Sequence, residues 1–165
     1  MKRVLWIIGI IVLLGLGVFL FQENTFYIKV IGKSMEPILH EGTFYQAEFV
    51  SSFEKERGEM VVFSMENRDK PFIKQLIGLP GDEFSYVIDG EDMYFTLIDT
   101  DIFLPKYKET GLFTMLQFYF PDTTEGQIPE GRCFVVGSNQ AVSVDSLDFG
   151  FIKCEKIFAK IIKTK

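Results

Sequence analysis

The sequence contains few of the residues from which metal and nucleophile sites are usually built. Its 165 residues include a single histidine, His40, and only two cysteines. The Cys and His spacings of zinc sites are therefore absent, and we expect no metal and no other cofactor. Basic residues are also outnumbered, because 17 Lys and Arg stand against 23 Asp and Glu and the net charge is −6. The absence of a basic stripe argues against nucleic-acid binding.

Apolar residues, in contrast, are abundant. They make up 47% of the chain, which contains 18 phenylalanines, and this composition indicates contact with membrane lipid in addition to a packed core. An uncharged run extends from Val4 to Phe21. At about 1.5 Å per helical residue it could cross most of a hydrocarbon core of roughly 30 Å. We therefore expect a single transmembrane helix over residues 4–21.

The charges beside this run predict its orientation. Lys2 and Arg3 precede it, so the positive-inside rule leaves residues 1–3 in the cytoplasm and places residues 22–165 on the outer side of the cell membrane. A cleaved signal peptide should have a shorter apolar core and small residues at its exit, whereas this run ends in LFQEN. A buried core helix should have a polar face, which this run lacks. We predict a retained, single-pass anchor.

The remainder of the chain has the composition of β-strands. Runs such as TFYIKVIG and MVVFSM are rich in β-branched and aromatic residues and end at turn residues. In EFSYVIDGEDMYF, the pair Asp89-Gly90 lies between two alternating runs and predicts a hairpin. YKETGLFTMLQFYF also reads as strand, and so does FGFIKCEKIFAKIIK, although the latter resembles an amphipathic helix. The sequence thus predicts one mostly-β domain behind one membrane helix.

Ser34, in the stretch VIGKSMEPILHEG, follows a predicted strand and is a candidate nucleophile. His40 is poorly placed to be its base, because it lies six positions later in the same turn-rich stretch, where most histidines are simply solvated. A lysine can act as the base only when it is neutral, and an exposed lysine, with a pKa of about 10.4, is charged. Burial against apolar groups lowers that pKa because the charged form loses hydration.

Lys74, in PFIKQLIGLPGD, is the candidate that meets this requirement. Strand alternation places Phe72, Lys74 and Leu76 on one face, so the lysine is flanked by apolar side chains. The alternative is a lysine at a strand edge that keeps its ammonium group in water, which is the commoner case. Periodicity alone leaves both interpretations open.

Three segments together resemble the type I signal peptidases, in the single-anchor form of Gram-positive bacteria. GKSMEPIL resembles their serine box, SMxPTL; FIKQLIGLPGD resembles their lysine box; and GSNQAVSVDSLDFG resembles their third box, GDNRxxSxDSRxxG. The three occur in the family's order, behind an N-terminal anchor. The resemblance implies a mostly-β, membrane-bound serine endopeptidase that removes N-terminal signal peptides from secreted preproteins after a small residue.

The resemblance also implies roles for individual residues. Ser34 matches the nucleophile, Lys74 the general base, and Ser143 the serine that hydrogen-bonds and orients the lysine. The backbone N–H of Ser34 would donate to the oxyanion. An extended substrate would pair with strands beside Ser34 and Lys74. Four residues match positions that line a shallow apolar pocket for small substrate side chains: Val30, Met35, Leu39 and Phe72.

The third box departs from the family pattern and leaves a second hypothesis open. Gln75 and Ser138 are neutral at two positions that form a salt bridge in the family. Loss of both charges destabilises a site less than loss of one, because no buried charge is left uncompensated. Leu147 replaces the arginine that usually neighbours Asp145. A catalytically weak or inactive membrane-anchored relative that binds exported or surface proteins is therefore the alternative. Retention of the three matched catalytic residues favours an active peptidase, and the anchor disfavours a self-cleaving Ser/Lys repressor.

The two cysteines lie outside the membrane in this topology, where a disulfide is permitted. Cys133 and Cys154 flank the third box, and a hairpin could bring them together. Nothing in the sequence fixes their separation, and we predict two unpaired thiols packed in strands.

Overall fold

The computed structural model describes residues 25–50, 55–66, 68–89, 92–98, 107–108, 114–116 and 123–162. The predicted anchor over residues 4–21 lies outside these ranges. Within them, no helix is long and apolar enough to cross a membrane.

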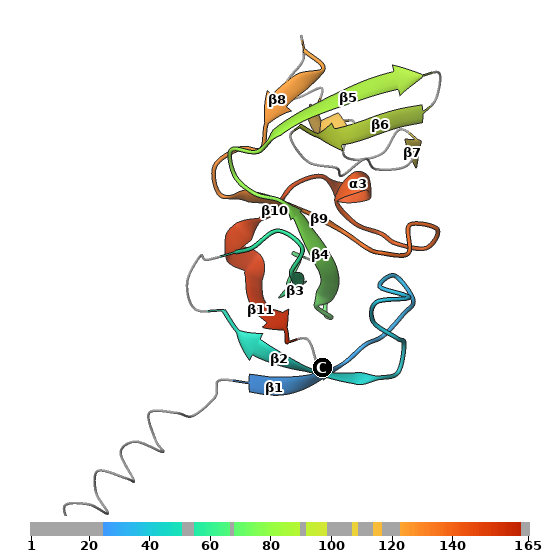
Figure 1. The fold of residues 1–165 in the computed structure, drawn as a ribbon, viewed down its shortest axis with the longest axis vertical. Coiled ribbons are helices and arrows are strands. Elements are labelled where there is room, and N and C mark those ends of the chain that lie inside the picture. The colour runs from blue at the N-terminus through green and yellow to red at the C-terminus, as the bar shows by residue number, and fades with distance from the viewer. Residues whose placement is uncertain are drawn as a thin grey trace, which may run out of the picture.

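The described strands form two antiparallel sheets (Figure 1). The larger sheet has seven strands in the order β1-β2-β11-β3-β4-β9-β10. These strands are β1 (Thr25–Lys29), β2 (Phe44–Phe49), β3 (Met60–Phe63), β4 (Phe72–Gly78), β9 (Arg132–Val136), β10 (Ile152–Lys153) and β11 (Ile157–Ile161). The predicted mostly-β fold is confirmed.

The smaller sheet lies at one end of the molecule, at the top of Figure 1. Its strands follow the order β7-β6-β5-β8. They are β5 (Glu83–Asp89), β6 (Asp92–Leu97), β7 (Tyr107–Lys108) and β8 (Glu125–Gln127). The predicted hairpin is confirmed as β5 and β6, although Asp89 is still a strand residue and pairs with Asp92.

Helical structure within the described residues is limited to short segments. These are α3 (Ser146–Phe149), the 3₁₀ helix η1 (Cys154–Lys156) and the three residues 114–116. The strand prediction was wrong for residues 114–116, where Leu116 is buried in a core and tertiary packing overrides the β-propensity of the aromatic run. The last predicted strand run is confirmed as β10 and β11, with η1 between them.

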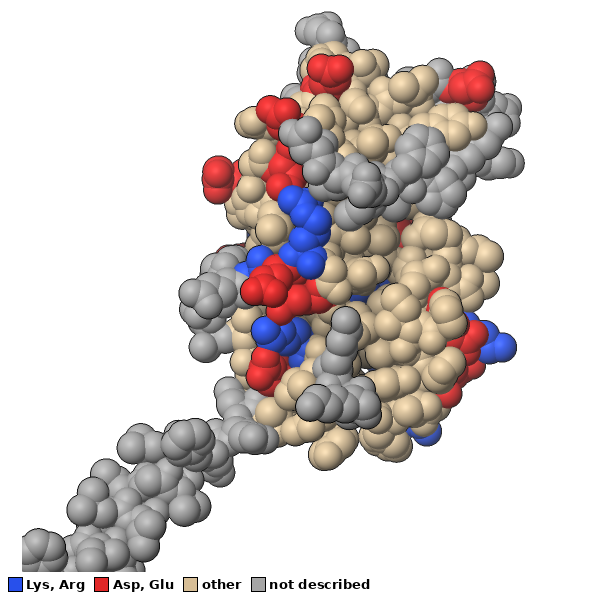
Figure 2. All heavy atoms as spheres, in the orientation of Figure 1, with Lys and Arg blue, Asp and Glu red and all other residues tan. Residues whose placement is uncertain are grey.

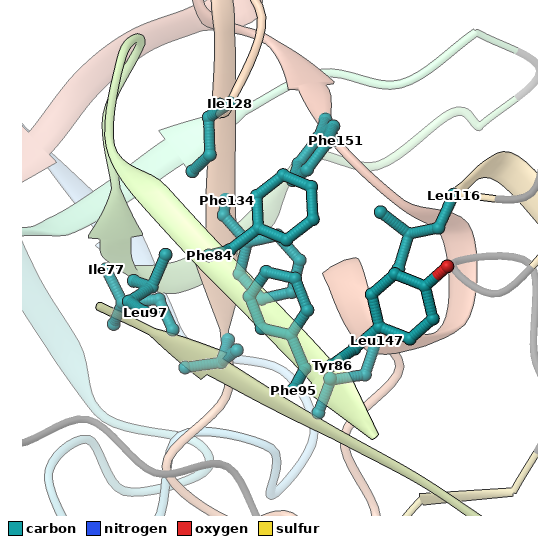
Figure 3. Packing of buried hydrophobic residues seen from close by; sticks show 11 residues of the cluster. Ile77, Phe84, Tyr86, Phe95, Leu97, Leu116, Ile128, Phe134, Leu147 and Phe151 are labelled. Carbon is teal, nitrogen blue, oxygen red and sulfur yellow. The ribbon is translucent and has the colours of Figure 1, made fainter. Parts of the chain in front are cut away.

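Four phenylalanines lie in the core between the smaller sheet, β9 and α3 (Figure 3): Phe84, Phe95, Phe134 and Phe151. The rings of Phe95 and Phe134 stack with centroids 4.6 Å apart, and Phe151 meets Phe134 edge-on at 5.6 Å. Leu147 of α3 packs into the same cluster. Such aromatic pairs contribute about 0.5–1.5 kcal/mol beyond their burial, so this cluster holds β9 firmly against the smaller sheet.

Cys133 and Cys154 are joined by a disulfide, so the prediction of two unpaired thiols was wrong. Cys133 of β9 pairs with Ile152 of β10, and the backbone N–H of Cys154 donates to the carbonyl of Gly131 at 2.8 Å. This antiparallel return sets the two Cα atoms 5.2 Å apart, within bridging range. The bridge therefore closes the loop that contains the third box.

This bridge should contribute strongly to stability. It joins residues separated by 21 positions, for which the loop-closure model gives about 3 kcal/mol. We expect the full-length Cys133→Ala, Cys154→Ala variant in detergent to lose about 2–4 kcal/mol of unfolding free energy in denaturant titrations. Reduced wild-type protein is the control and should match the variant. Equal stability of oxidised and reduced wild type would contradict the prediction.

Candidate active site

Ser34 lies in a tight turn that follows β1. The turn is closed where the N–H of Val30 donates to the carbonyl of Thr43 at 2.9 Å. It is anchored by Met35 and Leu39, which are buried in one apolar cluster with Val30. Ser34 itself is half-buried and directly precedes Met35. Its position is therefore fixed by the packing of its neighbours as well as by backbone hydrogen bonds.

Lys74 lies in the middle of β4 and is only 2% exposed. Its cross-strand partner is Val61 of β3, and Phe72 and Leu76 pack with Val61 in one apolar cluster. β4 lies inside the sheet between β3 and β9, so the strand-edge interpretation of Lys74 was wrong. The predicted burial of Lys74 among apolar residues is confirmed.

Burial also determines the titration of this lysine. Desolvation lowers the pKa of Lys74 below the ordinary lysine value, and the negative charges of Asp145 and Asp148 oppose this effect. Desolvation is the larger effect, in keeping with the burial of Lys74 in the sheet. Burial likewise lowers the pKa of Lys55 to about 8, but Lys55 does not line the cleft that contains Ser34. Among the lysines that the structure describes, Lys74 is the one that both has a lowered pKa and lines this cleft.

The loop after β9 is organised by the carboxylate of Asp145, which is fully buried. This carboxylate accepts hydrogen bonds from the Ser143 hydroxyl at 2.6 Å, the Gly137 N–H at 2.9 Å and the Leu147 N–H at 3.1 Å. Asp145 is also the N-cap of α3, in a reciprocal capping box with Asp148. Ser143 is thus held by a side chain that is fixed from several directions.

The loop after β9 also contacts the serine turn directly, and both lie on the same side of the molecule in Figure 1. The carbonyl of Ser34 accepts a hydrogen bond from the N–H of Asn139 at 3.0 Å, and the carbonyl of Asn139 accepts one from the N–H of Ser143 at 3.0 Å. A Cβ atom at Gly137 would lie 2.2 Å from the Ser143 hydroxyl oxygen and 2.5 Å from the Ser34 carbonyl oxygen. The close approach of these segments requires glycine at position 137.

Ser34 and Lys74 line one cleft of about 810 Å³. Three of the four residues predicted to form a substrate pocket also line it: Val30, Met35 and Phe72. Leu39 does not, and is buried behind the turn. His40 is exposed and is not a lining residue. The structure thus brings the predicted serine and lysine to one cavity, with Ser143 in the adjoining loop.

The altered positions of the lysine box and the third box are occupied by neutral residues and form no charge pair. The Gln75 amide donates to the carbonyl of Gly58 at 3.3 Å. Ser138 Oγ and Gln140 Oε1 are buried without a hydrogen-bond partner in the described part of the chain. Leu147, at the usual arginine position, packs into the phenylalanine core. Support for this loop therefore comes from Asp145, from the Gln140 amide, which donates to the Gly137 carbonyl at 2.6 Å, and from apolar packing.

Sequence reasoning did not identify the parts played by Gly137, Asn139 and Asp145. Asn139 contributes through its backbone N–H and carbonyl, and Gly137 through the absence of a side chain. A residue pattern indicates neither. The available signal for Asp145 was its place two residues after Ser143 and three before Asp148, the spacing of a helix N-cap with a capping box.

A serine and a desolvated lysine at one cleft of a mostly-β protein are the parts of a Ser/Lys hydrolase. A family profile described as "Signal peptidase, peptidase S26" matches residues 1–163 of this chain. Signal peptidase I of Bacillus caldolyticus is 31% identical over 169 residues, covering 97% of this chain and 87% of that protein.

Two further relatives are similar to this chain. Signal peptidase IB of Staphylococcus aureus (strain COL) is 29% identical over 171 residues, covering 94% of this chain and 85% of that protein. A crystal structure of a signal peptidase I from Enterococcus faecalis has a TM-score of 0.38 and 25% sequence identity, over 65% of this chain and 96% of that one. From the profile and the Bacillus relative, the chain belongs to the signal peptidase family, peptidase S26, and is a serine endopeptidase.

The lowered pKa of Lys74 predicts a pH-dependent cost to stability. Between its folded pKa and about 10.4, the unfolded chain binds more protons at this residue than the folded chain, so wild-type stability rises with pH in this window. We expect Lys74→Met to be more stable than wild type near neutral pH, and this difference to shrink as the pH approaches about 10.

Denaturant titrations from neutral pH to about pH 10 would measure this difference. Lys153→Met, at an exposed position of β10, is the matched control and should leave the pH slope unchanged. A Lys74→Met variant whose stability difference from wild type is the same at every pH would contradict the prediction.

Proposed function

We propose that this chain removes N-terminal signal peptides from exported preproteins, with Ser34 as nucleophile and Lys74 as general base. The proposal rests mainly on one observation: a buried lysine with a lowered pKa lines the same cleft as a serine held in a rigid turn. A neutral amine can accept a proton and an ammonium ion cannot, so desolvation gives Lys74 the capacity that catalysis needs.

The reaction follows from this pair. As Ser34 Oγ attacks the carbonyl carbon of the scissile bond, its proton passes to the neutral Nζ of Lys74, and the N–H of Ser34 donates to the oxyanion. The protonated lysine then gives this proton to the leaving amine, which departs as the new N-terminus of the mature protein. Water, deprotonated by Lys74, then attacks the acyl-serine ester, and the protonated lysine returns this proton to Ser34 Oγ as the signal peptide leaves with a free carboxyl terminus.

Ser143 is proposed to orient Lys74. A hydroxyl has one proton to donate, and that of Ser143 is given to Asp145 at 2.6 Å. The lone pairs of the Ser143 oxygen can then accept an N–H of Lys74, which directs the lone pair of the neutral amine toward Ser34. Asp145 acts through Ser143 and is a positioning residue in this scheme.

The cleft walls fit a substrate with small side chains before the scissile bond. Val30, Met35 and Phe72 provide an apolar lining, and we place the small substrate side chains against them. Leu39 supports this wall from the core rather than contacting the substrate. An extended segment of the preprotein would lie between the chain preceding Ser34 and the start of β4.

Membrane attachment forms part of the same proposal. Residues 4–21 would anchor the protein as a single-pass helix, with its N-terminus in the cytoplasm and the domain on the outer face of the cell membrane. Tyr27, Ile31 and Phe44 are exposed apolar residues of β1, the serine turn and β2. They would contact lipid near the anchor and keep the cleft close to membrane-embedded substrates.

A weakly active or inactive relative that binds exported or surface proteins is the second candidate. It is favoured by the unsatisfied Ser138 and Gln140 atoms, which indicate an altered support beneath the site. The intact hydrogen bonds of Asp145 weigh against it, because they hold Ser143 without help from those positions.

A cleavage assay tests the proposal. Full-length protein in detergent would be given a preprotein whose signal ends in Ala-x-Ala, with product formation followed by mass spectrometry. We expect Ser34→Ala and Lys74→Met to lower kcat by more than about 10³-fold, since each removes an element of the nucleophile–base unit. Lys55→Met and His40→Ala are matched controls at positions outside the cleft and should retain activity.

The assay distinguishes the Ser34/Lys74 mechanism from the binding alternative. Wild-type-like cleavage by Ser34→Ala or Lys74→Met would contradict the mechanism. If wild-type protein cleaved no preprotein but bound a fluorescent signal peptide, the binding alternative would replace the proposed activity.

A further inference from the structure

The outer part of the cleft carries an excess of positive charge. Lys29, Arg68 and Lys70 line it and are here called the cationic rim, whereas Asp69 is the single acidic residue among the lining residues described. The chain as a whole has a net charge of −6, so this excess runs against the overall composition. It therefore marks a place where a negatively charged ligand would be favoured.

The three rim cations are exposed and make no ion pair with any described residue. Lys29 lies over the ring of Phe44 at 5.8 Å, a contact that leaves its charge uncompensated. Other cations are paired: Arg57 with Asp82 at 2.7 Å and Lys160 with Glu59 at 2.8 Å. Figure 2 shows charges of opposite sign lying next to each other along one side of the molecule. Unlike these paired cations, the three cations of the rim can interact with a bound ligand.

The rim residues precede the catalytic pair by a few residues in both segments of the chain. Lys29 precedes Ser34 by five residues, and Lys70 precedes Lys74 by four. Along the chain, Val30 lies between Lys29 and Ser34, and Phe72 lies between Lys70 and Lys74, and both apolar residues line the cleft. Residues 30–34 form a turn rather than a strand, so the extended rise of about 3.3 Å per residue gives an upper limit, and an extended substrate would reach the rim within four or five residues of the scissile bond. The residues nearer the bond would occupy the apolar part of the cleft.

Resting on the proposed function, we propose that the cationic rim recognises an acidic side chain four or five residues before the scissile bond. The side of the bond follows from the apolar walls, because the small residues that precede the cleavage point are placed between the rim and Ser34. Preproteins with Asp or Glu at that distance would be preferred over neutral ones. The rim residues contact the substrate in this scheme and determine specificity without taking part in the chemistry.

The effect should be moderate and sensitive to salt. Exposed charge pairs are weak, so a preference of about 3- to 10-fold in kcat/KM is expected for a side chain that meets two or three cations. Screening lengths are about 8 Å at physiological ionic strength and about 3 Å at 1 M, so the preference should fall as salt is added.

The test uses two preproteins that differ only at the fifth residue before the bond, Glu in one and Gln in the other. Full-length enzyme in neutral detergent would be assayed at low salt and at about 1 M salt. We expect wild type to prefer the Glu substrate and Arg68→Gln, Lys70→Gln to lose this preference, measured as the ratio of kcat/KM for the two substrates. Lys153→Gln, an exposed cation of β10 outside the cleft, is the matched control and should keep the preference.

The outcomes distinguish this proposal from the proposed function. If wild type cleaves both substrates at the same rate, the rim proposal is wrong and the peptidase function stands; if it cleaves neither, the function itself is wrong. If the double variant still prefers the Glu substrate, the rim does not cause the preference and the proposal is wrong. If the double variant instead loses only binding to phosphatidylglycerol-containing vesicles, the rim serves lipid headgroups and the proposal is overturned.

Discussion

The burial of one lysine is the constraint on which the rest of the site depends. Lys74 lies in the interior of a seven-stranded sheet, opposite Val61 and between Phe72 and Leu76. An ammonium ion in this position loses most of its hydration, which favours the neutral amine. The same side chain in water would be protonated at neutral pH and unable to act as a base. The sheet thus converts an ordinary residue into a candidate catalyst.

The remaining elements place other groups around this lysine with little freedom. Phe134 and the disulfide at Cys133 fix β9, so the chain that leaves β9 enters the site from a firm support. Gly137, which has no Cβ, then allows the Ser34 turn and Ser143 to approach each other. The Asp145 carboxylate joins this loop to α3. Apolar packing makes the site rigid, and the hydrogen bonds of Asp145 orient the polar groups of the loop.

The sequence predicted the parts of the fold and site that depend on local pattern. Alternation in FIKQL placed Lys74 on an apolar face, and the Asp89-Gly90 pair indicated the β5–β6 hairpin. Family boxes brought Ser34, Lys74 and Ser143 together as candidates. These features are encoded within a few residues, so they can be recognised without knowing where distant segments lie.

Features that depend on distant contacts could not be predicted in this way. The separation of Cys133 and Cys154 is set by how β10 returns along β9, and Leu116 is helical in a segment whose aromatic residues favour strands. Leu39 matched a pocket position, but the path of the turn buries it behind the cleft wall. In each case the tertiary arrangement, which a linear pattern does not contain, decided the outcome.

The mechanism requires Lys74 to lose its proton at a lower pH than an exposed lysine does. NMR titration of ¹³C-labelled lysine side chains in the full-length protein tests it most directly, with the Lys74 resonance assigned by its loss in Lys74→Met. We expect the Lys74 amine to titrate at a lower pH than the exposed lysines of the folded protein. If Lys74 titrates together with them near pH 10.4, it is charged under working conditions and the proposed mechanism is wrong.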